Sequence, residues 1–250
     1  MEKYIQNKLS EIEKEENIRI LFAVESGSRA WGAISPDSDY DVRFIYSRPK
    51  EYYLRLDQTK DTLIFPINDN LDINGWDLDK ALKLLYKSNP TLFEWFSSPI
   101  IYRKTDISDR FAPLLDYYFS AQTCMHHYLG IAETKFKHDV LSRTETTPKK
   151  YLYILRPILA CKWIIDKNSP APILLSALKS TYLDEAYESV VERLLQLKTE
   201  KPEVHYIPKV ECIDNYIKNS LIEIRESLNA LPKTLEKSWN MINSFFVDSI

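Results

Sequence analysis

Residues 25–46 of this 250-residue chain read ESGSRAWGAISPDSDYDVRFIY, a glycine-containing loop followed by closely spaced carboxylates. Two of only four glycines in the chain, Gly27 and Gly32, lie in this loop, and Gly75 lies beside a later acidic segment. A chain that uses glycine so rarely places it where the backbone needs dihedral angles that other residues avoid, or where it must approach a ligand closely. The loop is therefore the first candidate for a functional site.

The second half of this segment predicts a strand that begins beside two acids. Residues 42–46, VRFIY, are rich in β-branched and aromatic residues and follow a Ser-Pro-Asp-Ser turn. Because side chains alternate along a strand, we expect Asp39 and Asp41 on the same face. Two carboxylates held together repel one another unless a cation lies between them, and Mg²⁺ binds such oxygens together with waters and substrate phosphates. The alternative is a solvated turn, in which Asp and Ser are common.

The residues before the loop favour the metal-binding alternative. Residues 18–24, IRILFAV, predict a second strand that runs into Gly27 and Ser28. A turn of this kind exposes backbone N–H groups and a hydroxyl that can bind a phosphate. Arg29 adds a fork-shaped donor for phosphate oxygens. A phosphate-binding turn close to two carboxylates predicts a site for a nucleotide bound with Mg²⁺.

The order of these residues resembles a known signature. Gly27-Ser28, a spacer of about ten residues and then Asp-x-Asp is the signature of the DNA polymerase β-like nucleotidyltransferase superfamily, and the longer string GSRAWG…SDYDVR matches in order. Three further segments are similar to one subfamily, the RlaP or YcgL-type predicted nucleotidyltransferases, which are linked to RNA repair and often accompany RNA ligases. These segments are residues 72–82 (DINGWDLDKAL), 88–95 (SNPTLFEW) and 149–157 (KKYLYILRP). The resemblance spans most of residues 18–165.

The resemblance implies a metal-dependent enzyme that transfers a nucleoside monophosphate from an NTP, expected to be ATP, to an acceptor hydroxyl. Superfamily members bind two Mg²⁺ ions, for which Mn²⁺ can substitute, with three carboxylates, and Asp39 and Asp41 match two of them. One ion grips the triphosphate and the other activates the attacking hydroxyl. Gly27, Ser28 and Arg29 match the nucleotide-binding positions.

The third carboxylate is either Asp72 or Asp77. Asp72 has apolar neighbours on both sides within the strand-like residues 71–74, whereas Asp77 precedes an amphipathic helix and is expected to cap it. We therefore expect Asp72 to be the third metal ligand and Asp77 the N-cap, with an exposed strand-edge acid as the alternative for Asp72.

The composition is that of a soluble globular protein, with 44% hydrophobic and 28% charged residues. The first residues are polar and mixed in charge, unlike a signal peptide, and no apolar run reaches the length of a membrane span. Three widely spaced cysteines lack a metal-binding pattern and are expected to be reduced thiols. These features predict a cytoplasmic protein without a membrane partner.

The chain is predicted to form two domains. Residues 1–105 mix short strands and helices, which indicates an α/β (α+β) nucleotidyltransferase sheet domain. Residues 106–250 are predicted to form an all-α helical bundle, with apolar residues at three- and four-residue spacing, such as Ile213, Ile217 and Ile224, and with prolines between the helices. A cleft between domains is a common place for a substrate.

The charge distribution bears on the acceptor. A net charge of −3 argues against nonspecific coating of nucleic acid, but residues 134–150 carry a local charge of +3. Lys150 lies in this basic segment, and Arg156 is the only charge within residues 151–161. Both are candidates for contacts with the phosphates of an RNA end; the alternatives are a solvated helix face for the basic segment and a structural ion pair for Arg156.

Three functions are therefore open. The first is nucleotidyl transfer to an RNA 3′ end in RNA repair, with an RNA ligase as a functional associate. The second transfers the nucleotide to a protein, as in toxin–antitoxin AMPylation, or to a small molecule. The third is a catalytically inactive nucleotide-binding module, against which the retained Gly-Ser and acids argue.

Overall fold

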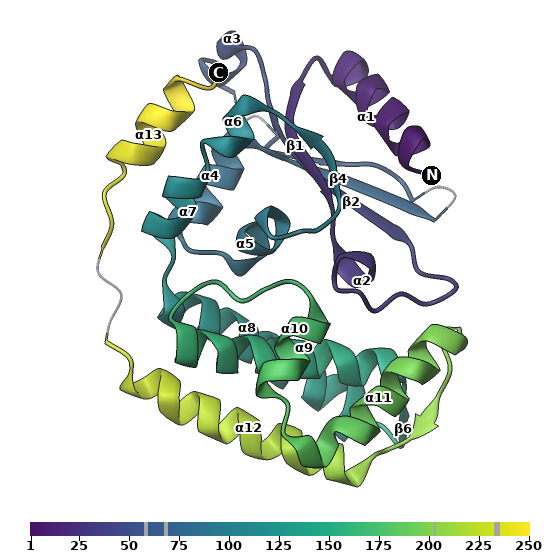
Figure 1. Cartoon of the computed structure of the whole chain (residues 1–250). Coiled ribbons are helices and arrows are strands. Elements are labelled where there is room, and N and C mark those ends of the chain that lie inside the picture. The colour runs from purple at the N-terminus through teal and green to yellow at the C-terminus, as the bar shows by residue number, and fades with distance from the viewer. Residues whose placement is uncertain (58–59, 68–69, 203, 233–235) are drawn as a thin grey trace. The chain divides into compact units, whose positions relative to one another are not determined.

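The computed structural model describes residues 1–57, 60–67, 70–202, 204–232 and 236–250 of the chain, which is drawn in Figure 1. The chain forms two compact units. The first contains Met1–Gly27, Asp39–Phe119 and Glu236–Ile250, and the second contains Ser28–Ser38 and Ser120–Leu235. The chain therefore crosses between the units within the glycine-containing loop, where the short helix α2 (Gly27–Ala30) lies, as well as after Phe119.

The first unit is built on a five-stranded mixed sheet with the order β3-β4-β2-β1-β5. The two central strands follow the predicted pattern, because β1 ends at the loop and β2 begins directly after Asp39. β2 pairs antiparallel with β1 and parallel with β4. The strands are β1 (Arg19–Glu25), β2 (Tyr40–Ser47), β3 (Thr62–Ile64), β4 (Leu71–Asp77) and β5 (Ile101–Lys104).

Helices cover both faces of this sheet. On one face, the buried side chains of α1, including Ile5 and Leu9, join a core with Val42, Phe44 and Tyr46 of β2. Because side chains alternate along β2, Asp41 and Arg43 belong to the opposite face. α4 contacts β2 and β4. The helices of this unit are α1 (Glu2–Glu16), α3 (Lys50–Tyr53), α4 (Leu78–Tyr86), α5 (Pro90–Phe96), α6 (Asp106–Asp109), α7 (Ala112–Tyr118) and α13 (Asn240–Val247).

An aromatic cluster explains why the first unit extends beyond residue 105. Phe96 of α5 stacks on Phe22 of β1 at a ring distance of 4.6 Å and on Phe111 at 4.7 Å. Phe111 in turn contacts Phe245 of α13 at 4.8 Å. These rings bind α13 and the chain before α7 to the sheet helices. The observed division at Phe119, with α13 in the first unit, thus differs from the predicted boundary between residues 105 and 106.

The second unit is a helical bundle around α9 (Pro148–Lys167). Most of the side chains of α9 between Tyr151 and Cys161 are buried, and it is packed against α8, α10, α11, α12 and the π-helix η1. The predicted periodic face is confirmed in α12, where Ile213, Ile217 and Ile224 are buried. The other elements are α8 (Ala121–Lys135), the π-helix η1 (Phe136–Leu141), α10 (Leu175–Tyr182), α11 (Glu185–Glu200), α12 (Glu211–Ala230) and the short strands β6 (Glu145–Thr146) and β7 (Ile207–Pro208).

Residues 28–38 belong to this helical unit because Trp31 is fixed there. The carbonyl of Trp31 accepts a hydrogen bond from the Leu175 N–H at 3.0 Å. Its ring lies 4.4 Å from the guanidinium of Arg156 and 4.6 Å from the ring of Tyr153. The tryptophan of the GSRAWG motif therefore anchors the loop to α9.

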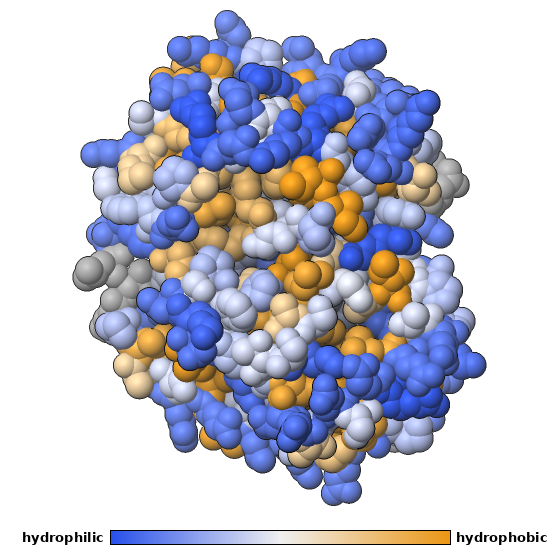
Figure 2. Space-filling model, viewed as in Figure 1, coloured by the Kyte–Doolittle hydropathy of each residue, from blue (hydrophilic) through white to orange (hydrophobic). Residues whose placement is uncertain are grey.

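The predicted fold class is confirmed, since a mixed sheet is followed by a region of helices. Figure 2 shows hydrophilic side chains over much of the visible face, with apolar side chains grouped in patches between them. Among the described residues, no helix combines the length and the apolar character needed to cross a membrane.

Candidate active site

The parallel pairing of β2 and β4 brings two of the predicted acids together. The register pairs Asp41 of β2 directly with Asp72 of β4. Paired residues on adjacent strands project from the same face of a sheet, so the two carboxylates are neighbours. Both side chains are partly buried, with exposed fractions of 26% and 21%. The sheet therefore creates an acidic pair from residues that are distant in the sequence.

Arg43 binds this acidic pair. Its guanidinium donates to Asp41 Oδ1 at 3.0 Å and to Asp72 Oδ2 at 2.7 Å. It also donates to the carbonyl oxygens of Val42 at 3.1 Å and of Asp72 at 2.9 Å. One cation thus bridges both carboxylates and reduces their mutual repulsion. The role of Arg43 was not predicted, although its position two residues after Asp41 on one strand placed it on the same face.

Two further polar residues fix the carboxylates. Asn74 donates to Asp72 Oδ1 at 2.7 Å. Glu25, which is fully buried, accepts from the Asp41 N–H at 2.7 Å and from the Tyr102 hydroxyl. The roles of Asn74 and Glu25 were not predicted. The only signal in the sequence was the position of Glu25, an acid at the end of an apolar strand. A buried carboxylate requires such partners, so Glu25 secures the backbone of Asp41.

Gly27 lies directly against the carboxylate of Asp41. Its φ angle is +59°, a conformation that residues with a side chain rarely adopt. A Cβ atom added at this position would lie 2.0 Å from Asp41 Oδ2, which is far inside contact distance. Glycine is therefore required here both by the backbone and by the position of the acid.

Gly75 has a different role. A Cβ atom at Gly75 would lie 2.2 Å from Cε2 of Phe44. The ring of Phe44 is part of the core beneath α1, so this glycine makes room for packing in the core.

Asp39 lies immediately before β2 and is exposed. The structure thus brings together Asp41 and Asp72 through strand pairing, and Asp39 lies two residues before Asp41 in the chain. Among the described residues, no group of three or more His, Cys, Asp and Glu side chains is clustered in the manner of a metal centre. The paired carboxylates nevertheless fit a divalent cation, because they are hard oxygen donors that already share the positive charge of Arg43.

Asp77 caps a helix, as predicted. Its side chain accepts from the Asp79 N–H at 3.0 Å at the start of α4, and also from the hydroxyl of Tyr53 at 3.0 Å. Only 2% of Asp77 is exposed, and burial raises the pKa of its carboxyl group to about 6. Asp77 is five positions from Asp72 on the same strand, so it belongs to the opposite face of β4.

The remaining residues of the signature form a buried hydroxyl cluster in the second unit. Ser28 Oγ donates to Ser38 Oγ at 3.2 Å, and Arg29 donates to the Ser38 carbonyl at 2.9 Å. The hydroxyls of Ser35 and Ser38 are 2.7 Å apart. Lys198 of α11, only 4% exposed, donates to Ser35 Oγ at 3.4 Å. The involvement of Lys198 was not predicted, because it is remote in sequence and lies in a helix without a motif.

The two predicted RNA contacts lie in different surroundings. Arg156 is 2% exposed, donates to the Ile173 carbonyl at 3.2 Å and lies over the ring of Trp31. These contacts support a structural role, and its phosphate contact stays a prediction. Lys150 is partly buried at the start of α9, where its ammonium group is 3.4 Å from Asp139.

Comparison with known proteins gives three similarities. Residues 1–248 match the model of RlaP, described as the RNA repair pathway DNA polymerase beta family. The chain is 36% identical over 252 aligned positions to the uncharacterized protein YcgL of Bacillus subtilis (strain 168), an alignment that covers 100% of this chain and 96% of the relative. The solved structure of a nucleotidyltransferase-like protein from Exiguobacterium sibiricum 255-15 overlaps with a TM-score of 0.33 at 11% identity, over 90% of this chain and 75% of that one.

Proposed function

The chain belongs to the RNA repair pathway DNA polymerase beta family, and on that premise we propose that it is a metal-dependent nucleotidyltransferase. The proposed reaction moves a nucleoside monophosphate from an NTP, most simply ATP, to a hydroxyl at an RNA 3′ end, and pyrophosphate leaves. An RNA ligase that acts on the same ends is the proposed functional partner.

One observation carries this proposal. The register of two parallel strands pairs Asp41 with Asp72. The Asp41 carboxylate occupies the space that a Cβ atom at residue 27 would need, so only glycine fits there. A structural role alone does not explain two carboxylates on one face beside a glycine in the left-handed conformation, since apolar residues would stabilise the sheet better. The arrangement suits a site that must bind a cation and a nucleotide together.

The acids would hold the metal ions. Asp41 and Asp72 present adjacent carboxylates, and Asp39 adds a third from the residue before β2. When bound, two Mg²⁺ or Mn²⁺ ions would supply Lewis-acid chemistry, activating the acceptor hydroxyl and offsetting charge on the phosphates. Glu25 and Asn74 would keep the carboxylates in position through the hydrogen bonds described above.

Arg43 has a separate task in this scheme. Its guanidinium balances the negative charge of the two carboxylates. A divalent cation held by the same two carboxylates would compete with Arg43 for them. The flexible Arg43 side chain would then be able to reach a phosphate oxygen, an acceptor that guanidinium groups bind well.

The triphosphate is proposed to bind at the loop that follows Gly27. Ser28 supplies a hydroxyl and Arg29 a guanidinium group, and Lys198 adds an ammonium group to the same serine-rich segment. Such donors suit phosphate oxygens, and the residues remain linked to the carboxylates through the short chain segment between Ser38 and Asp41.

The test is a transfer assay with ATP labelled at its α-phosphate, Mg²⁺ and a single-stranded RNA that ends in a free 3′ hydroxyl. We expect the label on the RNA, and none on the same RNA blocked by a 3′ phosphate. Asp41→Asn keeps the shape but removes a charge, and should abolish transfer. The control is Asp106→Asn, which changes an exposed acid whose carboxylate is 3.7 Å from Arg19, away from the acidic pair.

The assay also separates the alternatives. Label on a protein or small molecule, and none on RNA, would show that the acceptor belongs to the second class considered from the sequence. Metal-dependent ATP binding without transfer to any acceptor would indicate an inactive nucleotide-binding module. Equal transfer by Asp41→Asn and the wild type would refute the metal site itself.

A further inference from the structure

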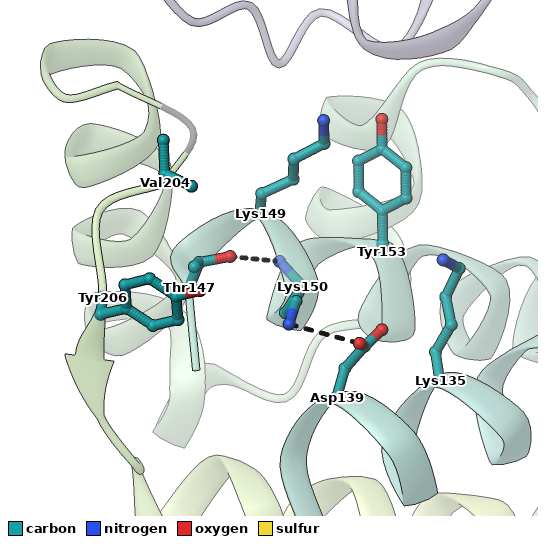
Figure 3. Close-up of a pocket in the computed structure, with 8 residues that line it drawn as sticks. All are labelled: Lys135, Asp139, Thr147, Lys149, Lys150, Tyr153, Val204 and Tyr206. Carbon is teal, nitrogen blue, oxygen red and sulfur yellow. Dashed lines mark hydrogen bonds and ion pairs between the residues drawn. The ribbon is translucent and has the colours of Figure 1, made fainter. Parts of the chain in front are cut away.

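A pocket of about 330 Å³ has described lining residues that all belong to the second unit, from the end of α8, η1, the start of α9 and the segment before β7. Its volume is at the lower end of the range for small-molecule sites, about 300–1,000 Å³. Figure 3 shows that lysine side chains line it from α8 and α9, with Val204 and Tyr206 on the facing wall. None of these described lining residues belongs to the first unit, which contains the paired carboxylates.

Positive charge dominates the described lining of this pocket. Lys135, Lys149 and Lys150 contribute three ammonium groups, whereas Asp139 is the one acid among the described lining residues. The acid is already 3.4 Å from the Lys150 ammonium group. Two lysine charges therefore exceed the acidic charge of the described lining, which favours an anionic ligand.

The ring of Tyr153 holds these two lysines in place. The ammonium groups of Lys135 and Lys149 lie 5.4 and 5.5 Å from its centroid, and Figure 3 shows the ring between them. Tyr153 is itself packed against Trp31 at 4.6 Å. The two charges are therefore held on either side of the ring, where each can contact a phosphate of a nucleic-acid backbone.

The facing wall offers a flat apolar surface. Tyr206 is 57% exposed and Val204 is 71% exposed. An exposed aromatic ring beside clustered lysines is the usual arrangement of proteins that bind single-stranded nucleic acid, where the ring stacks on a base and the lysines contact the backbone. An acidic peptide would use the lysines but would not need the ring.

We propose that this pocket binds a single-stranded RNA, with backbone phosphates at Lys135 and Lys149 and one base on Tyr206. The proposal rests on the proposed function, because it supplies the site that holds the acceptor strand. A free nucleotide carries the same base and phosphate, so the experiment includes both sources.

The test measures the binding of a short fluorescein-labelled single-stranded RNA to the full chain by fluorescence anisotropy, over a range of salt concentrations. EDTA is present and NTP is absent, so the measurement does not depend on transfer. The Lys135→Gln/Lys149→Gln double variant should bind more weakly. Its slope of log Kd against log salt should fall by about 0.7 for each RNA phosphate that the variant no longer neutralises.

Matched controls distinguish the loss of a pocket residue from the loss of any surface charge or any surface ring. Lys137→Gln changes an exposed lysine two residues from Lys135 that is outside the described lining, and should bind like the wild type. Tyr206→Leu should weaken binding about tenfold with an unchanged salt slope, while Tyr206→Phe keeps the ring and the affinity. Tyr4→Leu, which changes an exposed tyrosine of α1, is the control for loss of a surface ring.

The outcomes distinguish this proposal from the proposed function. Equal losses in the Lys137→Gln and double variants, or no loss in either, would overturn the pocket assignment even if transfer to RNA proceeds. Asp41→Asn should retain full RNA affinity, so RNA binding without any transfer would overturn the enzymatic proposal alone. Competition by AMP at concentrations near those effective for RNA would identify the free nucleotide as the source, and equal competition by polyglutamate would overturn the nucleotide assignment.

Discussion

Replacing Arg43 by methionine is the most direct probe of the acidic pair, because it removes the cation that bridges the two carboxylates. The substitution deletes four hydrogen bonds, two of them to the carboxylates of Asp41 and Asp72 at 3.0 and 2.7 Å. It leaves the carboxylates side by side with no guanidinium between them. We therefore expect the variant to fold but to be less stable than the wild type.

The expected loss of stability depends on how deeply the ion pairs of Arg43 with Asp41 and Asp72 are buried. Breaking a fully buried ion pair costs about 3–5 kcal/mol, whereas an exposed pair contributes about 0–1 kcal/mol. The three side chains are 18–26% exposed, so an intermediate loss of about 2 kcal/mol is expected. For a chain of this size that corresponds to a fall in melting temperature of about 4–8 °C.

A divalent cation should reverse this loss. Bound at a concentration of about 100 Kd, a ligand stabilises the folded state by about 2.7 kcal/mol. In the wild type the cation would compete with Arg43 for the carboxylates, so its apparent Kd is higher and the same metal concentration stabilises the protein less. Mg²⁺ or Ca²⁺ should therefore raise the melting temperature of Arg43→Met by several degrees more than that of the wild type.

Arg103→Met provides the matched control for this experiment. Arg103 is 22% exposed and binds Glu13, which is 26% exposed, and also donates to Ser10 Oγ at 2.9 Å. It lies on the same sheet but outside the acidic pair, so its loss of stability should not respond to metal. The reasoning would be refuted if Arg43→Met were as stable as the wild type without metal, or if metal raised all three melting temperatures equally.

Two glycines and the capping aspartate give the remaining expectations. Gly27→Ala should abolish metal-dependent transfer in the labelled ATP assay, because its Cβ would displace the carboxylate of Asp41. Gly75→Ala should instead lower the free energy of unfolding by about 1–3 kcal/mol in a denaturant titration through overpacking against Phe44, while the folded protein keeps its activity. For Asp77, burial raises the folded-state pKa to about 6, above the ordinary value of about 4, so its neutral form is favoured and stability should fall as pH rises from about 4 to about 6. Asp77→Asn should keep the cap and flatten this part of a stability–pH curve, and an unchanged curve would show that another group causes the slope.

Local features of the chain predicted the elements but not their partners. Alternating and β-branched residues indicated β1 and β2, and an aspartate before an amphipathic run indicated the cap at Asp77. The choice of Asp72 over Asp77 followed from strand and cap chemistry alone. The structure gives the two acids the environments that this choice requires, although metal binding by Asp72 stays a prediction.

The roles of Arg43 and Glu25 escaped prediction for a physical reason. Each depends on a residue brought close by the sheet, Asp72 for Arg43 and Tyr102 for Glu25, and such long-range pairs have no periodicity in the sequence. The same holds for Lys198, which approaches Ser35 only because α11 folds back onto the bundle.

The amino-acid sequence by itself determined the loop, the acids and the family, because glycine dihedrals, strand alternation and helix capping act over a few neighbouring residues. Only the tertiary structure decided that Asp41 is paired with Asp72, that Trp31 fixes the loop to Arg156, and that α13 belongs to the sheet unit. These results depend on strand register and on the burial of aromatic rings. Both are set by contacts between segments that are distant in the sequence. These contacts stabilise the protein only when the whole core is packed.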